Sequence, residues 1–135
     1  MKNPFPPRAF LPDVRIPFTP NPIPGLHVVA NLAVAPEKLF SFEPFQDFIK
    51  EQIRENQLQD VGSVFHNFPN GGFTAVICLT ESHLSIHTWP ENNYLTFDIF
   101  LSNYLKDNRA ITRRLYENVK AYFQATVLFE QIIER

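Results

Sequence analysis

The polar segment Thr80–Glu91 constrains the fold of this chain most, because it interrupts an otherwise apolar part of the sequence. One apolar run, Ala75–Leu79, precedes it, and another, Tyr94–Leu101, follows it. Short apolar runs bounded by turn-forming residues are typical of β-strands. The segment between them carries two glutamates, two histidines and several hydroxyl side chains. So much polar chemistry inside a hydrophobic protein predicts a functional site.

Hydrophobic periodicity predicts the other elements. A first helix is expected with Ser41 as its N-cap, and a second from about Asp107. Runs of strands with only two helices indicate an α+β two-layer sandwich, a mostly antiparallel sheet with both helices on one face. The other face should also be apolar if the strands are as hydrophobic as they read, so the protomer is expected to dimerise into a larger sandwich. Strands are expected at His27–Leu32, Val61–His66, Phe73–Thr80, Leu84–Thr88, Tyr94–Leu101 and Gln124–Ile133.

The chain divides into a short arm and one folded domain. Residues 1–24 hold most of the 12 prolines and predict an extended, proline-rich N-terminal arm, since proline fixes φ and removes a backbone donor. Gly25 opens the folded domain, residues 25–135, which is long enough for one hydrophobic core.

Composition argues against several classes of protein. The net charge of −2 and the absence of a basic run indicate no nucleic-acid partner. No apolar run approaches the roughly 20 residues that span a bilayer, and none at the N-terminus predicts a signal peptide. The single cysteine, Cys78, fits a reducing compartment, so we expect a cytoplasmic protein.

The central segment closely resembles the self-cleavage segment of bacterial S-adenosylmethionine decarboxylases. Glu81–Glu91 reads ESHLSIHTWPE, and the turn His66–Gly72 resembles the family's H-x-F-x-P-x-G loop with the proline shifted to Pro69. The resemblance covers roughly residues 25–135 and is strongest over residues 66–98. It implies a homodimer with two active sites, which could be shared between the chains, acting in polyamine (spermidine) biosynthesis by supplying the aminopropyl donor.

The resemblance also implies how the cofactor arises. In this family the serine oxygen attacks the preceding carbonyl to give an ester, and elimination then splits the chain and leaves a pyruvoyl group. Carried over here, the cut falls between Glu81 and Ser82, and Ser82 becomes the pyruvoyl group. That ketone forms a Schiff base with the substrate amine and accepts the electrons released as carbon dioxide leaves.

Four other positions match functional positions of the family. His87 matches the histidine that moves protons during self-processing, and Thr74 matches a processing-site serine, with the hydroxyl kept. Phe68 matches the aromatic residue that stacks on adenine, and Glu91 the carboxylate that binds the ribose hydroxyls. His83 and His87 could bind a metal on a helix, but the segment is typical of a strand, so no metal site is expected.

Simple geometry leaves the assembly of this site open. Thr74 and Ser82 would lie about 26 Å apart in a continuous extended chain. Ser82 and His87 would lie on opposite faces of one strand, because side chains alternate. Either a site built from two subunits or a turn between the strands would bring these groups together.

The chain departs from the family pattern at a few positions. The family has a cysteine where this chain has Ser102, and that cysteine reprotonates the substrate carbon; a hydroxyl is a far weaker acid. Cys78 could substitute, but it lies about 13 Å from Ser82 along an extended strand, which argues against it. Leu26 and Asn31 replace an arginine and an acidic residue of the first strand.

These departures leave alternatives to S-adenosylmethionine as the substrate. The same machinery could decarboxylate a basic amino acid, arginine or ornithine. The chain could also be an unprocessed, non-catalytic homologue that acts as a regulatory partner of an active subunit.

Overall fold

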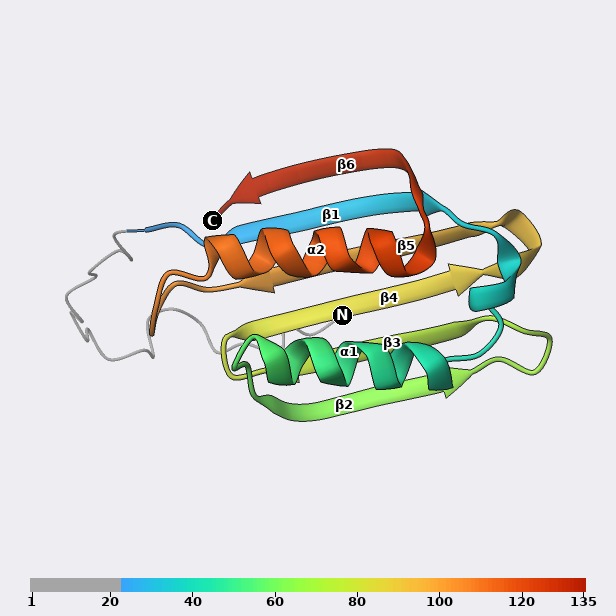
Figure 1. The fold of residues 1–135 in the computed structure, drawn as a ribbon, viewed down its shortest axis with the longest axis horizontal. Helices are drawn as coiled ribbons and strands as arrows, with labels where there is room; N and C mark the ends of the chain where they lie inside the picture. The colour runs from blue at the N-terminus through green and yellow to red at the C-terminus, as the bar shows by residue number, and fades with distance from the viewer. Residues whose placement is uncertain (1–22) are drawn as a thin grey trace, which may run out of the picture.

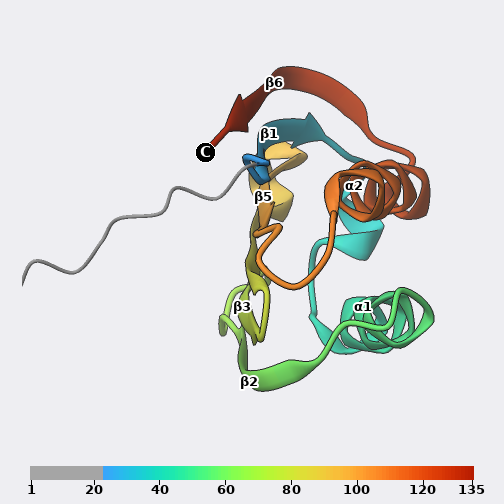
Figure 2. The ribbon, with the colours of Figure 1, turned by 90° about the vertical axis from the view of Figure 1, so that its left-hand side faces the viewer.

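The computed structural model describes residues 23–135, which form a six-stranded antiparallel sheet in the order β2-β3-β4-β5-β1-β6. Both helices cover one face (Figures 1 and 2), so the expected α+β two-layer fold is confirmed. The proline-rich arm expected over residues 1–24 lies almost wholly outside the described residues. The elements are β1 (Leu26–Ala33), η2 (Pro36–Lys38), α1 (Glu43–Glu55), β2 (Asp60–Asn67), β3 (Phe73–Leu79), β4 (Ser82–Trp89), η3 (Pro90–Asn92), β5 (Tyr94–Leu101), α2 (Arg109–Phe123) and β6 (Thr126–Glu134).

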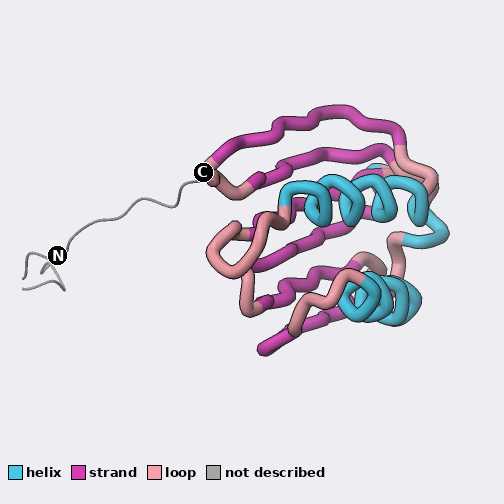
Figure 3. The backbone as a smooth tube through the Cα atoms, turned by 60° about the vertical axis from the view of Figure 1, so that its left-hand side comes forward, coloured by secondary structure: helices cyan, strands magenta, loops and turns pink. Residues whose placement is uncertain are grey.

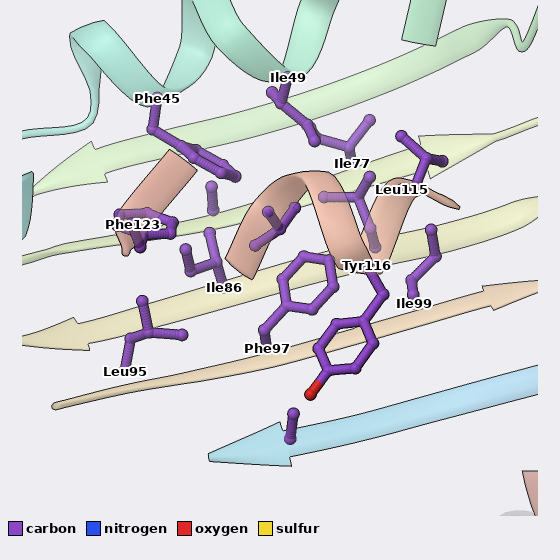
Figure 4. Packing of buried hydrophobic residues seen from close by; sticks show 14 of the residues in the cluster. Phe45, Ile49, Ile77, Ile86, Leu95, Phe97, Ile99, Leu115, Tyr116 and Phe123 are labelled. Carbon is purple, nitrogen blue, oxygen red and sulfur yellow. The ribbon is translucent and has the colours of Figure 1, made fainter. Parts of the chain in front are cut away.

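The core lies between the sheet and the two helices (Figure 4). Along β3, β4, β5 and β1, every second side chain is buried against the helices, as the period of two in a strand requires. Phe45 of α1 stacks on Phe123 of α2 at a centroid distance of 5.8 Å and also contacts Phe73 of β3. The aromatic side chains thus join both helices to the sheet.

The predicted cap of the first helix is wrong. The N-cap residue of α1 is Phe42 rather than Ser41, and no side chain of the cap residue itself binds the helix end. Asn67 at the end of β2 supplies this function: its Oδ1 accepts the Phe42 N–H at 2.8 Å, and its Nδ2 donates to Glu43 at 2.9 Å. A strand residue far away in sequence therefore caps the helix, which local patterns do not reveal.

The expectation of an apolar outer face is also wrong in part. The sheet face away from the helices is half-buried and mixes polar with apolar side chains along its central strands. Strand alternation places on it the outward-facing residues His27, Val29, Asn31, Thr74, Val76, Cys78, His83, Ser85, His87, Thr96, Asp98 and Phe100.

The two ends of the described domain lie next to each other. Gly25 exchanges two backbone hydrogen bonds with Arg135, at 2.8 and 2.9 Å, so the end of β6 lies beside the start of β1 (Figure 3). Neither helix within residues 23–135 is long and apolar enough to cross a membrane.

The cap made by Asn67 predicts a difference between two substitutions. Replacing Asn67 by Ala removes the acceptor of the Phe42 N–H and should lower the free energy of unfolding by about 1 kcal/mol. Ser41→Ala is the control and should change it by much less. Urea denaturation of both variants measures this, and equal losses would contradict the assignment of the cap.

Candidate functional site

Strand β4 is a central strand, and Ser82 and His87 of the polar segment lie towards its opposite ends. It lies between β3 and β5 and pairs with both. Ser82 is in register with Leu79 of β3 and Leu101 of β5, whereas His87 is in register with Thr74 and Thr96. The turn at residues 80–81 therefore folds Thr74 back beside His87, not beside Ser82.

The backbone at Ser82 is strained. Its φ is +133°, a region that non-glycine residues rarely adopt, and such conformations cost on the order of 1–3 kcal/mol. Strain of this kind persists only where the surroundings hold it. Here the Ser102 N–H donates to the carbonyl oxygen of Glu81 at 2.8 Å, which holds the peptide unit that precedes Ser82.

The Glu81 side chain lies inside the protein, only 5% exposed. Its Oε1 accepts a hydrogen bond from Asn108 Nδ2 at 3.0 Å, and the same Nδ2 donates to the Ser102 carbonyl at 2.8 Å. A buried carboxylate needs such partners, because an unpaired charge is costly to remove from water. Glu81 and Ser102 are therefore connected through both backbone and side chain.

Thr74 and His87 form a close pair on the outer face of the sheet. Thr74 Oγ1 and His87 Nδ1 are 2.5 Å apart, and the two residues are direct cross-strand partners. Because the threonine hydroxyl both donates and accepts, it can orient the imidazole in either tautomer. Sequence reasoning placed both residues in the site, and the structure brings them into contact.

A pocket of about 350 Å³ opens beside this pair. It lies where β3 begins and β4 ends. Phe68 and Trp89 contribute exposed aromatic rings, 46% and 38% exposed, and Glu91 contributes a carboxylate. Its lining consists of Phe68, Gly71, Phe73, Thr74, His87, Thr88, Trp89 and Glu91. The predicted binding residues Phe68 and Glu91 thus share one concave site with Thr74 and His87.

The turn before β3 shapes this pocket and needs its two glycines. Gly71 and Gly72 have φ of +93° and +98°. A Cβ on Gly71 would lie 2.8 Å from the Phe40 ring, and one on Gly72 would lie 3.1 Å from the Thr88 carbonyl oxygen. The Thr88 hydroxyl donates to the Leu39 carbonyl at 2.8 Å and accepts the Phe73 N–H at 2.9 Å, which anchors the base of the pocket.

Ser82 does not reach this pocket within one protomer. His87 lies five positions further along β4, a distance of about 16 Å along the strand. Of the two solutions that the sequence left open, the turn exists but does not join Ser82 to His87. The candidate site is divided into the predicted cleavage end, with Glu81, Ser82 and Ser102, and a pocket end, with Thr74 and His87.

A hydrogen-bonded cluster occupies the outer face between these two ends. His27 Nε2 and His83 Nε2 lie 2.8 and 3.0 Å from the same oxygen of Asp98, and Ser85 donates to the other oxygen. Burial alone would raise the pKa of Asp98, but these hydrogen bonds outweigh it and hold the pKa below its usual range. The ligand atoms of His27, His83 and Asp98 lie within 4.8 Å of one another and could also hold a divalent cation.

The positions that depart from the family pattern lie in different settings. Ser102 is half-buried directly after β5, next to the Glu81 peptide. Leu26 is buried in the core, and Asn31 lies on the outer face. Cys78 is exposed and is the cross-strand partner of His83, so the turn at residues 80–81 brings it much closer to Ser82 than an extended chain would.

Sequence reasoning missed several residues of the site. Trp89 lies between His87 and Glu91 at the alternating spacing of a strand, so its place in the pocket could have been inferred. The cluster of His27 and His83 around Asp98 depends on the strand order β4-β5-β1. Asn108 at the start of α2 carries no recognisable signal, because its contacts come only from the tertiary fold.

Comparison with known proteins agrees with the geometry. The S-adenosylmethionine decarboxylase proenzyme of Hydrogenobaculum sp. is 39% identical over 77 residues, 56% of this chain and 58% of that protein, so the match spans less than two thirds of that relative. A proenzyme of the same name from Clostridium botulinum (strain Langeland) is 34% identical over 96 residues, 70% of this chain and 83% of the relative.

A solved structure shares the fold. The crystal structure of the adenosylmethionine decarboxylase from Aquifex aeolicus VF5 superimposes with a TM-score of 0.73 at 26% identity, covering 84% of this chain and 91% of that one. The sequence model of the S-adenosylmethionine decarboxylase family matches residues 26–134, which include every strand and both helices of the described domain. The chain therefore belongs to the S-adenosylmethionine decarboxylase family.

Proposed function

We propose that this chain is a self-processing, pyruvoyl-dependent decarboxylase that acts on S-adenosylmethionine. The observation that carries the proposal is the peptide bond between Glu81 and Ser82. Its carbonyl oxygen accepts the Ser102 N–H at 2.8 Å, and the serine that follows it has a strained φ of +133°. A polarised carbonyl next to a strained serine is the arrangement that an attack by the serine hydroxyl requires.

Self-cleavage uses only groups of this chain. The Ser82 Oγ forms a bond to the Glu81 carbonyl carbon, the C–N bond breaks, and the hydroxyl proton is transferred to the Ser82 nitrogen, which gives an ester. Loss of the Ser82 Cα proton then expels the Glu81 carboxylate. Negative charge develops on the Glu81 oxygen during the first step, where the Ser102 N–H already lies.

The residues at the cleavage end fit the group that the family uses. Ser82 supplies the carbon skeleton, and addition of water with loss of ammonia converts the dehydrated residue into a ketone. The pyruvoyl group supplies an electrophilic carbonyl that binds the substrate amine and takes up electrons as carbon dioxide leaves. His87 is the candidate for moving protons, since imidazole is the side chain most often used for proton transfer and Thr74 orients its ring.

The pocket supports a nucleoside substrate. Phe68 and Trp89 offer exposed aromatic faces for a base, and Glu91 offers a carboxylate that can accept hydrogen bonds from ribose hydroxyls. Aromatic faces also favour a positively charged sulfonium. Decarboxylated S-adenosylmethionine would then serve as aminopropyl donor for spermidine synthesis.

We infer that the active site forms between two copies of the chain. Ser82 and the Thr74–His87 pair lie about 16 Å apart on one strand, so neither end is complete alone. If two protomers pack their outer sheet faces together in opposite directions, the cleavage end of each meets the pocket end of the other. The single cysteine, Cys78, fits a cytoplasmic homodimer that holds no disulfide within the chain.

A second candidate function rests on Ser102. A serine in place of the thiol weakens the proposed proton donor. The buried Leu26 and the neutral Asn31 change the first strand as well. A same-family decarboxylase of arginine or ornithine is therefore the alternative for the active enzyme, and an unprocessed regulatory homologue is the alternative without catalysis.

Self-cleavage predicts two fragments of the purified protein. Intact-mass analysis should find residues 1–81 and a second fragment, 82–135, whose N-terminus is blocked. Ser82→Ala, which lacks the attacking oxygen, should stay whole and serves as the control. A wild-type chain that also stays whole would contradict the proposed function and favour the non-catalytic alternative.

The substrate is decided by release of labelled carbon dioxide. S-adenosylmethionine should be decarboxylated at least about tenfold faster than arginine or ornithine, since a site built for hydrogen bonds rejects ligands that lack the partner groups. Phe68→Ala and Glu91→Gln should each raise KM for it by about tenfold. Phe129→Leu, an exposed phenylalanine of β6 outside the pocket lining, should change it little. Faster turnover of a basic amino acid would favour the second candidate.

A shared site predicts complementation between two inactive variants. Ser82→Ala keeps His87, and His87→Ala keeps Ser82, so a mixed dimer holds one site with both groups intact. Alone, each variant should stay uncleaved; coexpressed, the His87→Ala chain should be cut, because the partner chain supplies its histidine. No cleavage in a mixed dimer that is shown to form would place the whole site within one protomer.

A further inference from the structure

We propose that Asn108 is a positioning residue for self-cleavage: its side-chain amide holds the Ser102 backbone against the Glu81 carbonyl that Ser82 attacks. The inference rests on the proposed function, because it concerns the cleavage step. Asn108 touches neither Ser82 nor the bond that breaks, so it acts through Glu81 and Ser102.

Three residues form a closed ring of hydrogen bonds. The Ser102 N–H donates to the Glu81 carbonyl oxygen at 2.8 Å. The Ser102 carbonyl accepts from Asn108 Nδ2 at 2.8 Å, and the same nitrogen donates to Glu81 Oε1 at 3.0 Å. Asn108 is fully buried and Glu81 is 5% exposed, so water does not compete for these bonds.

The orientation of the Asn108 amide is determined by its partners. Both are acceptors, so only the NH₂ end can face them. Within residues 23–135, the Asn108 Oδ1 is buried and has no hydrogen-bond partner. Asn108 is also the N-cap residue of α2, yet its oxygen makes no cap hydrogen bond. The side chain thus gives up the usual stabilising role of an N-cap asparagine and binds the cleavage end instead.

The backbone of Asn108 is anchored on both sides. Its N–H donates to Asn103 Oδ1 at 2.7 Å, and its carbonyl accepts the Thr112 N–H at 2.9 Å. Asn103 in turn donates to the Pro24 carbonyl at 2.7 Å, just before β1. The ring is therefore tied by hydrogen bonds to the first turn of α2 and to the segment that leads into β1.

This ring bears on one chemical step, the shift of the Glu81 acyl group from the Ser82 nitrogen to its oxygen. The step needs the carbonyl held in line with the hydroxyl and its oxygen facing a donor as negative charge develops. Without the Asn108 amide, Ser102 keeps only its own N–H contact and is free to shift. The later elimination removes the Cα proton and does not depend on that donor.

Two substitutions test the proposal on the full-length chain. Asn108→Ala removes the amide. Asn108→Asp keeps the shape and the N-cap position of α2 but loses both donors and brings a second carboxylate towards Glu81. Asn56→Ala is the matched control, since Asn56 is another buried asparagine that donates to a backbone carbonyl, that of Gln52, but lies at the end of α1.

The measurement follows cleavage of freshly translated protein over time on a denaturing gel, with thermal unfolding as a parallel readout. Both Asn108 variants should lengthen the half-time of cleavage by about 10- to 100-fold. Asn56→Ala should cleave at the wild-type rate even if its Tm falls as far as that of Asn108→Ala. Asn108→Asp puts a second buried carboxylate beside Glu81, so its Tm should fall; the comparison with Asn56→Ala at a similar Tm separates slow cleavage from poor folding.

Hydroxylamine distinguishes the two chemical steps, because it cuts the ester and leaves a hydroxamate on Glu81 and a free serine at position 82. If Asn108 positions the acyl shift, the slow variants should contain no more ester than wild type. Cleavage at the wild-type rate in both variants, or ester that accumulates in them, would overturn the inference alone. A wild-type chain that never cleaves would overturn the proposed function and this inference with it.

Discussion

The pairing of β4 with both of its neighbours determines where Ser82 and the Thr74–His87 pair lie. Its register with β5 brings Ser82 next to Leu101. The N–H of the following residue, Ser102, therefore lies beside the Glu81 carbonyl oxygen. Its register with β3 sets Thr74 against His87 at the other end. A slip of one residue would exchange the buried and exposed faces of β4 and separate both pairs.

The two faces of the sheet have different physical tasks. The face under α1 and α2 is closely packed with aliphatic and aromatic side chains, which makes the strand register rigid. The opposite face carries the histidines and hydroxyl groups, together with Asp98, whose pKa is lowered by its hydrogen bonds. The rigid face thereby gives the polar face the fixed geometry that chemistry requires.

Strain and burial concentrate at the proposed cleavage end. Ser82 has a backbone conformation that non-glycine residues avoid, and Glu81 places a carboxylate inside the protein. Both features cost stability and need compensation from the surrounding structure. The hydrogen bonds of Ser102 and Asn108 provide it, so the energetic cost lies where the proposed reaction occurs.

The sequence by itself determined the fold class and pointed to part of the candidate site. Apolar alternation identified the six strands, and helical spacing identified α1 and α2, because these periods follow directly from backbone geometry. The segment Glu81–Glu91, with Thr74 and Phe68, pointed to residues that the structure indeed gathers at two ends of β4. Only the tertiary structure decided which groups meet. Contacts such as Asn67 with Phe42, Asp98 with His27, and Asn108 with Glu81 join residues far apart in the chain, and no local pattern encodes them.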